Sequence, residues 1–188
     1  MLKSEIRALF KEKRKGLSFF ELNRRSTQLT QLIVTQFEFK NKHVSIFLPI
    51  EKQKEFDSYP LLEELIVRGA IPVISKSNFE DSSLTLFKYE NASQLEVNTF
   101  GIPEPKHGSI VPEIVLNFVF VPLLAIDKNG HRVGYGKGFY DKLLAKCHPD
   151  CLFIGISLFD EFVEIEDLNP FDISLHACFT PNHYYEFR

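Results

Sequence analysis

The segment from Gly130 to Gly138 contains four of the chain's nine glycines together with two cations, Arg132 and Lys137. Glycines at alternate positions let successive backbone N–H groups face one ligand, because no Cβ stands in the way. Guanidinium and ammonium groups add donors that suit phosphate oxygens. A helix that begins near Gly138 directs the positive end of its dipole to the same place. The segment therefore predicts a phosphate-binding loop.

Two better-known phosphate motifs do not fit this loop. A P-loop requires a glycine separated by four residues from its Gly-Lys pair, and His131 occupies that position. The dinucleotide fingerprint requires a third glycine where Phe139 stands. A glycine-rich turn that only joins a strand to a helix remains the alternative to a phosphate site.

A second group of cations lies on the first predicted helix, over about residues 2–15. Lys3, Arg7 and Arg14 fall within about 40° of one another at 100° per residue, so one helix face carries all three. Residues 1–25 contain eight Lys or Arg and three Glu, although the formal net charge of the chain is −3. This stripe could clamp a polyphosphate, form a solvated basic face, or contact nucleic acid.

Carboxylates near the loop are candidate metal ligands. Asp141 lies one turn into the helix after the loop, Asp127 ends the preceding strand, and Asp172 precedes the last strand. Magnesium prefers one or two carboxylates together with substrate phosphates. Asp141 is favoured because its distance from the loop is fixed, whereas Asp172 is also a candidate cap and Asp127 a candidate turn residue.

Strands and helices alternate along the chain. We expect helices over about 2–15, 18–38, 59–68 and 138–147, and strands over about 43–50, 71–76, 84–89, 114–126, 152–157 and 176–180. This alternation predicts an α/β fold: a single three-layer domain over residues 1–188, with a central, mostly parallel sheet and helices on both faces. Ligands of such sheets bind beyond the carboxyl ends of the strands, where the glycine loop is expected.

Composition adds few constraints. The hydrophobic share of 44% and the charged share of 25% are ordinary for a globular protein. The charged start and the lack of a long apolar run predict a cytoplasmic protein with no membrane segment. Cys147, Cys151 and Cys178 fit reduced thiols in a reducing compartment better than a disulfide framework. Their spacing also matches no strong zinc pattern.

The ordered motifs resemble the 5-formyltetrahydrofolate cyclo-ligase family, also called 5,10-methenyltetrahydrofolate synthetase. The family signature resembles Val121 to Asp141, its opening Lys-x-x-x-Arg matches Lys3 to Arg7, its Glu-x-Asp-(Thr/Ser) matches Glu55 to Ser58, and its Gly-x-x-Glu-Pro turn matches Gly101 to Pro105. The departures are small. Phe139 stands where tyrosine is common, Ile126 where phenylalanine is common, and Ser58 where threonine is common.

The resemblance implies ATP- and Mg²⁺-dependent cyclisation of 5-formyltetrahydrofolate to 5,10-methenyltetrahydrofolate, with release of ADP and phosphate. It assigns catalysis to Arg132, Lys137 and Tyr140, and magnesium to Asp141 and Asp172. The implied ATP contacts are Lys3, Arg7, Arg14, Arg132, Val133, Gly134, Tyr135, Gly136, Lys137, Gly138, Phe139 and Tyr140. The implied folate contacts are Ile50, Glu55, Phe100 and Tyr140. The expected partners are the folate and its polyglutamates, with no nucleic acid or membrane, for a monomeric protein.

Two other classes of function remain open from the residues. One is another phosphate-handling enzyme on a similar sheet, of the sugar-phosphate isomerase type, which would not need ATP. The other is a non-catalytic binding protein whose basic helix contacts nucleic acid.

Overall fold

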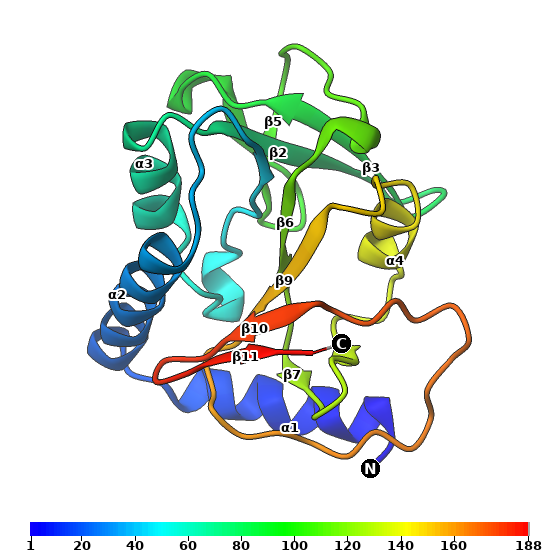
Figure 1. Ribbon diagram of the computed structural model, residues 1–188. Helices are drawn as coiled ribbons and strands as arrows, with labels where there is room; N and C mark the ends of the chain where they lie inside the picture. The colour runs from blue at the N-terminus through cyan, green and yellow to red at the C-terminus, as the bar shows by residue number, and fades with distance from the viewer. Residues whose placement is uncertain (188) are drawn as a thin grey trace.

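The computed structural model describes residues 1–187 and contains a seven-stranded sheet flanked by helices (Figure 1). The strand order is β11-β10-β9-β6-β1-β2-β3. The strands of this sheet are β1 (His43–Ser45), β2 (Ile71–Asn78), β3 (Ser83–Lys88), β6 (Phe118–Pro122), β9 (Leu152–Ile156), β10 (Ala177–Phe179) and β11 (Tyr184–Glu186). The five central strands are parallel, and only β3 and β11 pair antiparallel at the edges. The predicted α/β fold with a mostly parallel sheet is confirmed.

Helices cover both faces of the sheet, as predicted. Figure 1 shows α2 and α3 on one side and α4 on the other, with α1 across one end. The four α-helices are α1 (Lys3–Gly16), α2 (Phe19–Gln36), α3 (Tyr59–Val67) and α4 (Phe139–Leu144). Ser18 caps α2 by accepting a hydrogen bond from the backbone N–H of Glu21 at 3.1 Å. Gly69 follows α3 with φ +75°, a conformation that favours glycine.

The central strand β6 explains why the longest apolar run is apolar on both faces. Phe118 and Phe120 pack with α2 and α3 in one buried cluster. Val119 and Val121 pack with Leu143 of α4 in a second cluster on the opposite face. Because successive side chains of a strand point to opposite faces, a strand between two helical layers must be apolar at every position.

The chain reverses its winding direction at β1. From β1 it crosses to β2 on one side, and later returns to β6 on the other side of β1. The loops that follow β1 and β6 therefore leave the sheet in different directions and open a crevice between them, the usual binding place in such sheets. Helix α1 lies at this end, where it contacts β7 (Ala125–Ile126), β8 (Arg132–Val133) and the 3₁₀ helix η1 (Glu51–Gln53).

Several predicted boundaries differ from the structure. The expected strand over 43–50 pairs only as β1, and residues 46–48 stay buried beyond it. The apolar run over 114–126 divides into the 3₁₀ helix η3 (Glu113–Val115), β6 and β7. Strand β6 ends at Pro122, which has no backbone N–H to donate. Helix α4 ends at Leu144, earlier than predicted.

Some short elements had no clear signal in the sequence. These are β11, the hairpin of β4 (Leu95–Val97) with β5 (Pro103–Pro105), the β7–β8 hairpin and the 3₁₀ helix η2 (Ala92–Gln94). Their pairings span only two or three residues, too few for a periodic pattern to develop. Among residues 1–187, no helix has both the length and the apolar character needed to cross a bilayer.

Candidate functional site

A cleft of about 1280 Å³ lies at the reversal point of the sheet. It is bordered by α1, the loop after β1, the glycine loop after β8 and the loop before β10. Fifteen of the predicted site residues line it: Lys3, Arg7, Ile50, Glu55, Phe100, Arg132, Gly134, Tyr135, Gly136, Lys137, Gly138, Phe139, Tyr140, Asp141 and Asp172. Arg14 and Val133 lie outside the lining, both buried behind it.

Arg7 holds the glycine loop against α1. Its Nε donates to the carbonyl oxygen of Gly134 at 2.9 Å. Gly136 has φ +86°, and a Cβ on it would stand 3.0 Å from the guanidinium carbon of Arg7. Glycine at this position therefore meets two requirements, a left-handed backbone and the close approach of a cation.

Arg132 and Asp141 form a largely buried ion pair at the other side of the loop. Nη2 of Arg132 donates to Oδ1 of Asp141 at 2.7 Å, and its Nη1 donates to the carbonyl oxygen of Ile173 at 2.6 Å. The Arg132 side chain is only 7% exposed. Asp141 Oδ1 also accepts from the N–H of Ile173 at 3.1 Å. This network fixes α4 to the loop that precedes β10.

Lys3 and Asp172 form a second ion pair, between α1 and the loop before β10. The pKa of the Asp172 carboxyl lies below its usual value: burial alone would raise it, but the hydrogen bond from Lys3 and the charges of Lys3 and Arg132 outweigh burial. Asp172 is therefore ionised at neutral pH.

The two aspartates suit a magnesium ion that is shared with phosphates. Within residues 1–187, Asp141 accepts hydrogen bonds through Oδ1 and Asp172 accepts them through Oδ2. The Oδ2 atom of Asp141 and the Oδ1 atom of Asp172 are therefore left to coordinate a metal. In the described part of the chain, no group of three or more His, Cys, Asp or Glu side chains is arranged to hold a metal. Two carboxylate oxygens, one from each aspartate, fit Mg²⁺, which takes few protein ligands and completes its coordination shell with phosphates and water.

Lys137 projects from the centre of the loop. Its side chain is exposed, and within residues 1–187 it makes no ion pair or hydrogen bond. Its ammonium group is thus available to a ligand in the cleft, whereas the Arg132 guanidinium and the Lys3 ammonium group are paired with carboxylates.

Glu55, Tyr135 and Arg14 meet beneath the cleft floor. Tyr135 donates its hydroxyl proton to Glu55 Oε1 at 2.5 Å and accepts a hydrogen bond from Arg14 Nη1 at 2.8 Å. Arg14 Nη2 donates to the carbonyl oxygen of Leu123 at 2.6 Å. The structure therefore places the Arg14 guanidinium against protein groups, where the sequence-based expectation was an ATP contact.

Aromatic rings form the opposite wall. Phe79 and Phe100 lie 4.3 Å apart between ring centroids, and Phe139 meets Phe79 edge-on at 5.3 Å. Phe100 remains 61% exposed, so one face of its ring can stack against a flat ligand. Tyr140 lies nearby in the lining, and burial, followed by the charge of Glu55, raises the pKa of its hydroxyl well above the usual value. Its proton is retained at neutral pH.

Lys11 and Phe79 are among the lining residues that the sequence did not predict. Lys11 follows Lys3 and Arg7 at the same four-residue interval and lines the cleft, with its ammonium group 5.5 Å from the centre of the Tyr135 ring. That interval was the signal for it. Phe79 had no such signal, because it approaches Phe100 only through the turn between β2 and β3.

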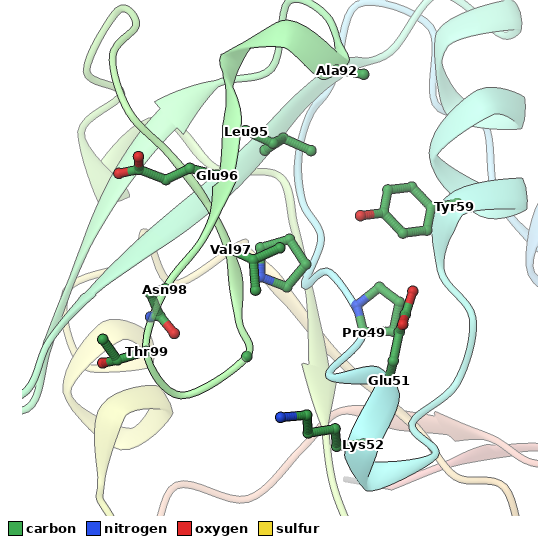
Figure 2. A pocket seen from close by; sticks show the side chains of 12 residues that line it. Pro49, Glu51, Lys52, Tyr59, Ala92, Leu95, Glu96, Val97, Asn98 and Thr99 are labelled. Carbon is green, nitrogen blue, oxygen red and sulfur yellow. The ribbon is translucent and has the colours of Figure 1, made fainter.

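A smaller hollow of about 550 Å³ lies beside the cleft, between α3 and the β4–β5 hairpin (Figure 2). Its walls include Pro49, Tyr59 and Val97, and its charged side chains are Glu51, Lys52 and Glu96. Fifteen predicted site residues line the larger cleft and none lines this hollow, so we place the chemistry in the cleft.

Comparison with known proteins decides the family. The model of the 5-formyltetrahydrofolate cyclo-ligase family matches residues 1–181. The chain belongs to this family. It is 32% identical to 5-formyltetrahydrofolate cyclo-ligase of Escherichia coli K12, over 76% of this chain and 80% of that protein. It is 29% identical to the mouse cyclo-ligase, over 77% of this chain and 74% of that protein. Family membership makes the chain a cyclo-ligase of folate one-carbon metabolism.

Solved structures support the same fold. The chain superposes on Aquifex aeolicus 5,10-methenyltetrahydrofolate synthetase with a TM-score of 0.81 and 28% identity, covering 100% of this chain and 94% of that one. For the synthetase of Mycoplasma pneumoniae the TM-score is 0.74 at 20% identity, with 95% and 98% covered. The cyclo-ligase fold therefore extends over the whole chain.

Proposed function

We propose that this cleft couples the cleavage of ATP to ADP and phosphate with the cyclisation of 5-formyltetrahydrofolate. The supporting observation is that one cleft contains a cationic, glycine-rich half and an aromatic half with a carboxylate. The first half suits a triphosphate, and the second suits a reduced pterin with N–H donors. Family membership implies the use of ATP.

On the phosphate side, Arg7 and Lys137 supply the positive charge. Backbone N–H groups of residues 134–138 add donors, and Lys11 extends the cationic stripe of α1. Since Lys3 and Arg132 are paired with carboxylates, we assign them to holding Asp172 and Asp141 beside the phosphates. Mg²⁺ held by these two aspartates would neutralise part of the phosphate charge.

On the folate side, Ile50 and Glu55 contact the pterin, and Phe100 stacks on a flat part of the ligand. Glu55 retains acceptor capacity, because a carboxylate has about four lone-pair sites and its hydrogen bonds to Tyr135 and the Ile50 N–H use two. Tyr140 keeps its hydroxyl proton and borders the reacting centre as a hydrogen-bond donor.

The reaction follows from this placement. The formyl oxygen attacks the γ-phosphorus, the bond to the β-phosphate oxygen breaks, and ADP leaves. N10 then attacks the activated formyl carbon and closes the ring, its proton passes to solvent or to the phosphate, and the carbon–oxygen bond breaks to release phosphate. The protein contributes position and charge stabilisation, which are the main terms in phosphoryl transfer.

A single assay tests this proposal. Purified protein is mixed with 5-formyltetrahydrofolate, with and without ATP and Mg²⁺, and the near-ultraviolet absorbance of the methenyl product is followed together with ADP. We expect product only when both are present, with one ADP per ring closed. ATP-independent turnover of a sugar phosphate would favour an isomerase, and retention on RNA or DNA at physiological salt would favour a nucleic-acid binder.

A further inference from the structure

We propose that the Tyr135 hydroxyl couples the two halves of the cleft, so that ATP and the folate each strengthen the binding of the other. Tyr135 belongs to the glycine loop, yet its hydroxyl reaches Glu55, which follows β1 and is separated from it by 80 residues. The inference rests on the proposed assignment of the loop to phosphates and of Glu55 to the folate. It makes Tyr135 a positioning residue.

The contact is well defined on the folate side. Glu55 is 5% exposed, and Oε2 accepts from the backbone N–H of Ile50 at 2.8 Å. Oε1 accepts from Tyr135 at 2.5 Å and lies 3.7 Å from Arg14 Nη1. Both carboxylate oxygens therefore have fixed partners, and the orientation of the carboxylate depends on where the Tyr135 hydroxyl lies.

The contact is equally well defined on the Tyr135 side. Arg14, 4% exposed, donates to the Tyr135 oxygen, so the hydroxyl proton is directed to Glu55. Burial, followed by the charge of Glu55, raises the pKa of this hydroxyl, which keeps its proton at neutral pH. Removing the hydroxyl alone would leave Arg14 and Glu55 in place but would detach the loop from the carboxylate.

The tip of the loop faces solvent. Gly136, Lys137 and Gly138 are exposed, and both glycines have positive φ. A folate that fixes Glu55 would fix Tyr135 and restrict the loop, so ATP would lose less conformational freedom on binding. By thermodynamic linkage, ATP must strengthen folate binding by the same factor.

The test measures this factor by calorimetry, with 5-formyltetrahydrofolate and a non-hydrolysable β,γ-imido analogue of ATP. In the wild type we expect each ligand to bind at least about fivefold more tightly when the other is present. In Tyr135→Phe the factor should fall below about twofold. The matched control is Tyr185→Phe. Tyr185 belongs to β11, packs on Phe162 and lies outside the cleft lining. It should retain the wild-type factor.

Amide hydrogen exchange provides a second measurement. The folate alone should slow amide hydrogen exchange in residues 134–138 of the wild type, and Tyr135→Phe should lose this effect. An unchanged factor in Tyr135→Phe, a wild-type factor near one, or unaltered exchange in the wild type overturns the coupling. A wild type that produces no methenyl product refutes the proposed function instead, so the two failures are distinguishable.

Discussion

Replacing Gly136 by alanine separates backbone strain from the position of Arg7. Gly136 and Gly138 have similar positive φ values, +86° and +75°. A left-handed alanine costs about 1–2 kcal/mol at either position. A Cβ at Gly138 meets nothing within 4 Å, whereas one at Gly136 would stand 3.0–3.2 Å from the Arg7 guanidinium. Arg7 must then move by a few tenths of an ångström, and its hydrogen bond to Gly134 is disturbed.

Backbone strain should therefore cost both variants about 1–2 kcal/mol of unfolding free energy in urea denaturation, and Gly136→Ala should lose up to about 1 kcal/mol more with its disturbed hydrogen bond. The two variants should also differ in their KM for ATP. The disturbed hydrogen bond is worth about 1 kcal/mol, so the KM for ATP should rise about fivefold more in Gly136→Ala than in Gly138→Ala. Initial rates of methenyl formation at varied ATP measure this. Equal KM values in the two variants would refute a role of Arg7 in holding the phosphates.

Three further predictions concern the charged groups. Lys137→Ala should lower kcat/KM for ATP by about a hundredfold while thermal melting stays near the wild type, because the side chain is exposed; an unchanged rate would contradict its role. Asp141→Ala should lower the free energy of unfolding by about 1–3 kcal/mol, because the largely buried Arg132 loses its carboxylate partner and keeps only the Ile173 carbonyl oxygen. Urea denaturation with no such loss would exclude a stabilising pair. The folded-state pKa of Asp172 is depressed, so its contribution is present at neutral pH and lost as pH falls through that pKa. The stability advantage of wild type over Asp172→Asn should therefore shrink in acid, and an advantage independent of pH would contradict this.

The sequence predicted the parts of the fold that depend on periodicity. The helices near residues 2–15 and 18–38, the doubly buried strand β6 and the capping Ser18 all produce local patterns. The short hairpins and β11 depend on tertiary pairing of two or three residues, so no local pattern indicated them.

The candidate site follows the same division. The glycine loop and the cationic stripe were visible because their members are close in sequence. The contacts of Arg14 could not be predicted, because a cationic stripe on a helix does not show that its last member bonds to Tyr135 and the Leu123 carbonyl oxygen. The Phe79–Phe100 stack likewise joins two loops that only the folded sheet brings together.

The pairing of Lys3 with Asp172 has a consequence for synthesis of the protein on the ribosome. Its partners are separated by 169 residues, and the Arg7–Gly134 contact spans 127. At about 5–20 residues per second, the first helix is synthesised many seconds before the glycine loop and the loop before β10 that it contacts. A nascent chain shorter than about 172 residues lacks Asp172, so the ion pair between the first helix and the loop before β10 can form only after that residue has been added.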